Sequence, residues 1–197
     1  EENISDKNNF TALLDTSING DSRINIKGSS INLETFFDNS NKKFNNLLFS
    51  LNIKKLFFGD RSLGETKLKV EIKNGSLLDL KGEIFHNGKS YLRFFDIGLK
   101  ENKLKKVLFK FDDLGLFLAE TKISDSFIKG KGNIYLYINK YDLSIDSGNI
   151  DISDSSIRNA SFLARLLQLA SFTGLLEILT NEGIPFSKIE GDFFVKN

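Results

Sequence analysis

The chain has 197 residues, of which 40% are hydrophobic and 27% charged, the composition of one or at most two globular domains. Lys and Arg total 27 against 26 for Asp and Glu, and a net charge of +1 is too small to favour nucleic acid as a partner. Cysteine is absent and histidine occurs once, which excludes disulfides, thiol nucleophiles and multi-histidine metal sites. Because methionine is also absent, even at position 1, we expect the sequence to be a fragment of a longer protein.

Apolar and polar residues alternate with a period of two through most of the chain, a pattern that predicts strands with one wet face. In residues 66–73, for example, Leu68, Val70 and Ile72 share one side and charged residues the other. About nine strands joined mostly by short polar turns predict a long antiparallel meander. The expected strands lie around residues 22–33, 47–53, 66–73, 78–84, 91–97, 107–111, 134–138, 143–145 and 150–152, with one short helical turn within residues 112–120.

Asn74-Gly75 is a hairpin signal between two alternating segments. A two-residue loop there would place Val70 opposite an aspartate, whereas a three-residue or bulged turn places Ile72 opposite Leu78 and Val70 opposite Leu80. We therefore predict the bulged turn, which gives the two strands one apolar face.

A second hairpin is predicted at Asn87-Gly88. A plain two-residue loop places Ile84 opposite Tyr91 and Leu80 opposite Phe95, so three neighbouring strands share the apolar face. Arg93 then lies on that face opposite Gly82 and fits it least well. The residues expected to line the face are Leu68, Val70, Ile72, Leu78, Leu80, Ile84, Tyr91, Phe95, Ile134, Leu136 and Ile138.

The period-two alternation stops in residues 155–182, where apolar residues recur at helical spacing and predict two short helices. Ser155 or Ser156 can cap the first, and Gly174 separates the two. The segment carries Arg165 and Glu177, too many charges for a membrane span. Alternation resumes in residues 183–197, which we expect to begin a further strand. The expected organisation is thus one unit over residues 1–197, with the sheet in 1–154, two helices in 155–182 and the start of a strand in 183–197.

Few residues are candidates for catalysis or for binding a metal or phosphate. His86 precedes a hairpin turn without the partners that a nucleophile or metal needs. Gly130-Lys131-Gly132 lacks the rest of a phosphate loop, and its glycines are more typical of a bulge or bend. The aspartates Asp112, Asp113, Asp146, Asp151 and Asp154 lack the spacing of a calcium loop and are typical of a wet strand face. We expect no catalytic residue, metal or cofactor.

The last third of the chain resembles the bacterial AsmA-like envelope proteins, the YhdP branch in particular, and residues 106–193 carry most of the resemblance. The motifs in which it lies are Asn159-Ala160, Leu163-Ala164-Arg165-Leu166-Leu167, Ser171-Phe172-Thr173-Gly174-Leu175-Leu176, Gly183-Ile184-Pro185-Phe186 and Ile189-Glu190-Gly191-Asp192-Phe193.

The resemblance implies a periplasmic protein of a diderm bacterium, anchored in the inner membrane by an N-terminal helix. It further implies a long, strongly curved sheet whose apolar groove carries phospholipids between inner and outer membranes. The chain departs from the family pattern by lacking that anchor and the strands that follow the Gly-Ile-Pro-Phe motif. The expected partners are phospholipid acyl chains, the remaining strands of the full-length protein and, through the missing anchor, a membrane.

Two alternatives stay open. Alternating residues most often form the core of a closed sandwich, which would make the chain an envelope scaffold or a module that binds proteins by strand addition. An enzyme acting on lipids or glycans would need a carboxylate pair or a Ser/His site. The scaffold and the carrier differ in whether the apolar face borders a continuous cavity or is packed solid.

Overall fold

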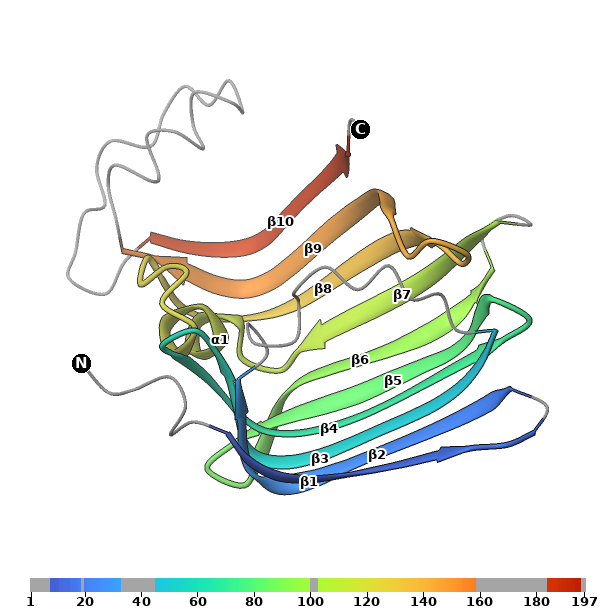
Figure 1. Ribbon diagram of the computed structural model, residues 1–197. Coiled ribbons are helices and arrows are strands. Elements are labelled where there is room, and N and C mark those ends of the chain that lie inside the picture. Colours follow the sequence, from blue (N-terminus) through green and yellow to red (C-terminus); the bar gives the residue numbers. More distant parts are fainter. Residues whose placement is uncertain (1–7, 19, 33–44, 100–102, 159–183, 196–197) are drawn as a thin grey trace.

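The computed structural model of the chain describes residues 8–18, 20–32, 45–99, 103–158 and 184–195. Ten strands form one open sheet, in which their order is their order along the chain (Figure 1). The strands are β1 (Asn9–Thr16), β2 (Asp21–Asn32), β3 (Asn46–Phe58), β4 (Arg61–Lys73), β5 (Ser76–His86), β6 (Lys89–Leu99), β7 (Leu104–Phe111), β8 (Phe127–Asn139), β9 (Ile145–Ile157) and β10 (Ile184–Phe194). A mostly β fold is confirmed.

The sheet is mixed rather than purely antiparallel. Every neighbouring pair is antiparallel except β2 and β3, which are parallel. Parallel neighbours need a connection of about a dozen residues or more to return to the same end of the sheet, and residues 33–45 supply it. The prediction of an antiparallel meander was wrong at this point.

The strand predictions differ from the sheet in two other places. β1 was not predicted, because the adjacent Leu13 and Leu14 break the alternation. The two segments predicted at 143–145 and 150–152 belong to one strand, β9, which continues to Ile157. Ser155 and Ser156, the expected helix caps, therefore lie within a strand, and the rest of the two predicted helices, in residues 159–183, lies outside the described residues.

The first hairpin contains a bulge, as predicted, and Val70 lies opposite Leu80. Asn74 and Gly75 form a two-residue loop with φ of 52° and 67°, and the register shifts between Glu71 and Ile72. Ile72 consequently pairs with Leu77 rather than Leu78. The bulge sits inside the ladder rather than in the turn.

The second hairpin has the predicted two-residue loop but an unpredicted bulge between Ile84 and Phe85. Ile84 pairs with Leu92 instead of Tyr91, because one extra residue in a strand moves all later side chains to the other face. Phe94, not Arg93, therefore lies opposite Gly82, and its ring fills the space that a Cβ at Gly82 would need. Arg93 lies on the other side of the sheet, which removes the misfit noted in the sequence.

The two sides of the sheet differ in polarity. Residues that pair across neighbouring strands share a side, so each run of paired residues forms a row across all ten strands. The middle row of one side, which we call the apolar face, is Ala12, Ile26, Leu51, Leu68, Gly82, Phe94, Phe109, Ile134, Ile150 and Gly191. The adjacent row, on the charged face, is Thr11, Lys27, Asn52, Lys67, Glu83, Arg93, Lys110, Asn133, Asp151 and Glu190.

The helix α1 (Leu114–Glu120) occupies the position of the predicted helical turn and lies at one end of the sheet (Figure 1). The carboxylate of Asp113 caps it by accepting a hydrogen bond from the Leu116 N–H at 2.9 Å. Leu114 packs into the core cluster, and the ring of Phe117 meets that of Phe111 at 4.9 Å. The helix therefore covers the apolar face at this end.

Candidate functional site

The apolar face consists of three rows of paired residues. On the α1 side of the middle row, the α1 row is Phe10, Gly28, Ile53, Thr66, Ile84, Leu92, Phe111, Gly132, Ile152 and Ile189. On the other side, the far row is Leu14, Ile24, Phe49, Val70 and Leu80 in β1–β5 and Asp96, Val107, Leu136, Gly148 and Phe193 in β6–β10. Leu80 and Asp96 come next to the paired Lys81 and Phe95, so alternation places both halves of the row on the same side. Asp96 is the one charged residue in the three rows.

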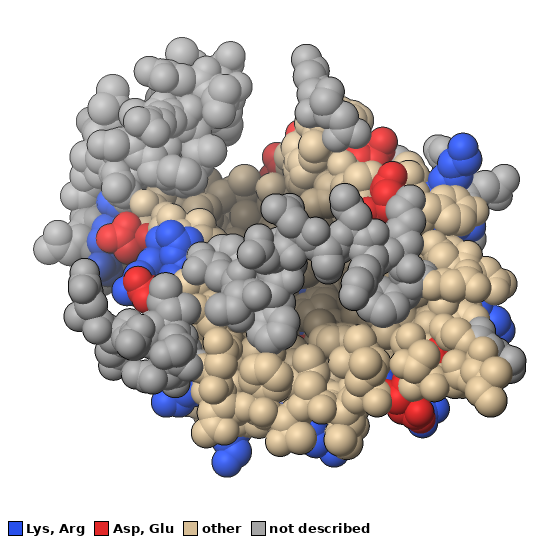
Figure 2. All heavy atoms as spheres, viewed as in Figure 1, with Lys and Arg blue, Asp and Glu red and all other residues tan. Residues whose placement is uncertain are grey.

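Burial varies along this face, and buried side chains also lie away from α1, at Leu51, Val107 and Ile138. Ile53, Ile84 and Leu92 of the α1 row are buried, as in any protein core. In the middle of the sheet, Phe94 and Phe109 are only partly buried, and their rings stack at 5.4 Å. Figure 2 shows the molecule hollowed at its centre, with visible walls that are mostly tan and Lys and Arg side chains along the outside. Part of the apolar face is therefore ordinary core and part is a partly buried apolar surface.

The structure brings together most of the residues predicted to line this face. Leu68, Val70, Leu80, Ile84, Ile134 and Leu136 lie in the three rows, and Ile72 and Ile138 share their side of the sheet in the next row outward.

Three predicted residues lie elsewhere, each because of a bulge. Leu78 is at the bulge of the first hairpin and is 47% exposed. Phe95 pairs with Lys81 and Leu108 on the charged face. Tyr91 is the extra residue of β6, and it is buried beneath α1 rather than in the middle of the sheet.

Several residues of the face were not predicted from the sequence. Phe94, Phe109, Leu51 and Ile150 lie in the middle row, although they were not among the predicted lining residues. For Phe94 a usable signal existed, because a glycine inside a strand often marks the close approach of a neighbouring group. Gly82 is that glycine.

Tyr91 closes the α1 end of the face. Its hydroxyl donates a hydrogen bond to the Leu63 carbonyl at 2.5 Å, and its ring lies 5.8 Å from that of Phe117. Burial, and to a lesser degree the negative charge of Glu120, raise the pKa of Tyr91 to about 12. The hydroxyl therefore remains protonated and acts as a fixed structural group.

The opposite end of the face carries an ion pair. The ammonium group of Lys105, in the row beyond Val107, pairs with the Asp96 carboxylate, and each side chain is only 10% exposed. Lys105 also donates a hydrogen bond to the Leu78 carbonyl at 2.7 Å, and the Gly98 N–H donates one to Asp96 at 2.9 Å. The pair thus joins β5, β6 and β7.

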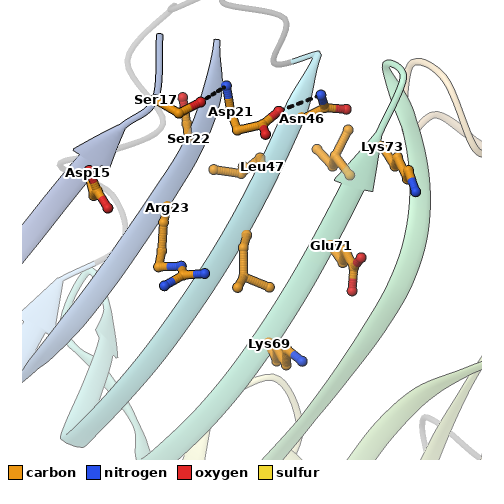
Figure 3. Close-up of a pocket in the computed structure, with 12 residues that line it drawn as sticks. Asp15, Ser17, Asp21, Ser22, Arg23, Asn46, Leu47, Lys69, Glu71 and Lys73 are labelled. Atoms are coloured by element: carbon orange, nitrogen blue, oxygen red, sulfur yellow. Dashed lines mark hydrogen bonds between the residues drawn. The ribbon is translucent and has the colours of Figure 1, made fainter. Parts of the chain in front are cut away.

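Hollows also occur on the charged face. One of about 530 Å³ lies near the β1–β2 turn and is bordered by Arg23, Lys69, Lys73, Asp15 and Glu71 (Figure 3). Another of about 590 Å³ lies over the middle of the sheet and is bordered chiefly by charged-face side chains. Basic and acidic side chains border both hollows, so neither selects clearly for a ligand of one charge.

The residues considered for chemistry remain apart. His86 lies at the end of β5, with its Nε2 3.0 Å from the Asn87 amide nitrogen and 3.9 Å from Glu120. Gly130-Lys131-Gly132 lies in β8, where the register with β9 shifts, as predicted for a bulge. Across the described ranges no three acidic or histidine side chains are grouped closely enough to hold a metal ion.

No helix in the described part of the chain is long and apolar enough to cross a membrane. Comparison with protein-family models, with curated proteins and with solved structures gives no match to this chain. The apolar face is therefore interpreted from its own geometry.

Proposed function

We propose that this chain is a segment of an AsmA-like, inner-membrane-anchored periplasmic protein that carries phospholipids between the inner and outer membranes of a diderm bacterium. The acyl chains would lie along the apolar face without any chemical reaction. The observation that carries this proposal is the only partly buried middle of that face, around Phe94 and Phe109, in an open sheet. Apolar side chains that remain in contact with water on such a face favour a partner that covers them.

The shape of the sheet supports the same proposal. In Figure 1 the strands bow, and we propose that this bend makes the apolar face the inside of a trough. Each methylene of an acyl chain that leaves water in such a trough contributes about 0.8 kcal/mol. Since this gain is non-directional, it requires no particular polar residue, consistent with the scarcity of catalytic groupings in the sequence.

Native mass spectrometry with lipid extraction, on the 197-residue chain purified without detergent, tests the proposal. We expect co-purified phospholipid that is lost in Val70→Asp and in Leu80→Asp, whose side chains lie on the apolar face. Lys69→Asp is the matched control, because Lys69 precedes Val70 in β4 and lies on the charged face. Circular dichroism establishes that each variant is folded.

The alternative is an envelope scaffold or protein-interaction module whose apolar face is closed by its own side chains. A folded wild-type chain that carries no lipid and takes up none from vesicles would favour this alternative. The complete burial of Val107 within the far row shows that parts of the face are indeed packed as core.

A further inference from the structure

The apolar face has two chemically different ends. At one end α1 covers it with Leu114 and Phe117. At the other end the Asp96–Lys105 ion pair lies on the same side of the sheet. Both ends can be located on β7, since α1 follows Phe111 and Lys105 is six residues earlier, which is about 20 Å along a strand.

An ion pair in this position is unusual. Charged side chains are expensive to remove from water, and surface pairs avoid that cost by remaining exposed. Glu65 and Lys67 show the ordinary case, with side chains 43% and 52% exposed. Asp96 and Lys105 are instead 10% exposed and surrounded by apolar rows.

The pair is also held rigidly. The carbonyl of Leu78, at the bulge of β5, accepts a hydrogen bond from Lys105, and the Gly98 N–H donates one to the other carboxylate oxygen of Asp96. An ammonium group has three N–H donors, and the contacts described above occupy two of them. Each carboxylate oxygen likewise has a second lone pair. The two charges therefore have remaining capacity for a ligand.

Resting on the proposed function, we infer that the Asp96–Lys105 pair is the head-group site of the apolar face, and that it takes a zwitterionic phosphate–ammonium head. The ligand phosphate lies at Lys105, its ammonium lies at Asp96, and its acyl chain runs over the partly buried Leu80 and Phe94 toward α1. An acyl chain lying across the ion pair would take the two charged groups further out of water and would offer them no hydrogen bonds in place of those to water. A purely anionic head would meet the carboxylate of Asp96, whereas a zwitterion matches both charges.

The test compares two ligands with the same acyl chain, lysophosphatidylethanolamine and the uncharged monoacylglycerol, each below its micelle concentration. We expect the wild-type chain to bind the zwitterion about tenfold more tightly, which corresponds to one hydrogen bond to a charged group at the low end of its usual contribution. Equal affinities would overturn the head-group site while leaving the proposed function standing. Binding of neither ligand would contradict both.

Variants locate the effect. The double variant Asp96→Leu/Lys105→Met replaces a buried pair by apolar side chains, a change that proteins often tolerate. We expect it to lose the tenfold preference and retain its affinity for monoacylglycerol, whereas Glu65→Leu/Lys67→Met, the same change at the exposed pair, retains the preference. A preference that survives in the first double variant would refute the inference.

The orientation has its own measurement. A nitroxide on the last carbon of the acyl chain of lysophosphatidylethanolamine should broaden the methyl resonances of Leu114 and Leu118 more than those of Ile138, which pairs with Lys105. Broadening that is strongest at Ile138 would place the acyl terminus at the ion pair and overturn the inference.

Discussion

Val107 and Val70 lie in the same row of the apolar face and permit a chemically identical perturbation at two degrees of burial. Val107 is completely buried, at 0% exposure, whereas Val70 is only partly buried. Val→Ala at either position removes two methyl groups. At about 0.8 kcal/mol for each buried group the transfer loss at Val107 is about 1.6 kcal/mol, and the cavity left behind raises the total to about 2–3 kcal/mol.

At Val70 the same deletion removes a smaller buried area and leaves a gap that solvent or a ligand can enter. We expect the free energy of unfolding to fall there by only about 0.5–1 kcal/mol. Urea denaturation measures both losses. With a slope near 2 kcal/mol/M, the Val107→Ala midpoint should fall by about 1–1.5 M and the Val70→Ala midpoint by less than about 0.5 M, with slopes unchanged.

Equal losses at the two positions would refute the reasoning, because they would mean that Val70 is covered in solution as fully as Val107. That result would also favour the closed scaffold over the lipid carrier. A loss below about 1 kcal/mol at Val107 would contradict its burial.

Two further predictions concern the α1 end of the sheet. Because the pKa of Tyr91 is raised from 10.0 to about 12, the folded state holds this proton more tightly, so its contribution is complete below pH 10 and is lost as the pH rises toward 12. Over that window the free energy of unfolding of the wild-type chain should fall by about 2–3 kcal/mol more than that of Tyr91→Phe. Absorbance at 295 nm should show one tyrosine titrating last. Equal losses in the two proteins would contradict the raised pKa. Asp113→Ala should lower the free energy of unfolding by about 1 kcal/mol, at low and high salt alike, because it removes the cap of α1. Asp112→Ala, which removes the exposed ion pair with Arg93, should lower the free energy of unfolding by a smaller amount, and only at low salt. The same salt dependence for the two variants would contradict the capping role of Asp113.

Periodicity in the sequence was sufficient to predict most of the strands and much of the apolar face, since burial on one side imposes a period of two. It predicted a bulge in the first hairpin but not the one in the second, because an inserted residue leaves the local alternation intact and changes only which side faces the core. The one-residue shift at Phe85 shows the consequence. Because of this shift, Phe94 and not Phe95 lies on the apolar face. Asp96 also lies on that face, whereas the predicted register placed it on the charged side.

The parallel pairing of β2 and β3 was also beyond the sequence, because either strand direction satisfies the alternation of Ile24, Ile26 and Leu51. Burial differences within one row could not be predicted for a related reason. Val70 and Val107 occupy equivalent positions in their strands, and only the surrounding three-dimensional packing makes one of them core.

The agreement between strand order and chain order gives the sheet the character of a one-dimensional stack. Each strand pairs only with the strands before and after it in the sequence, so the chain can add strands in order as it leaves the ribosome, without waiting for a distant partner. For the same reason, inserting or deleting an internal hairpin would lengthen or shorten the sheet while leaving the remaining pairings largely unchanged. A protein built in this way can change the length of its sheet by duplicating a short stretch of its gene.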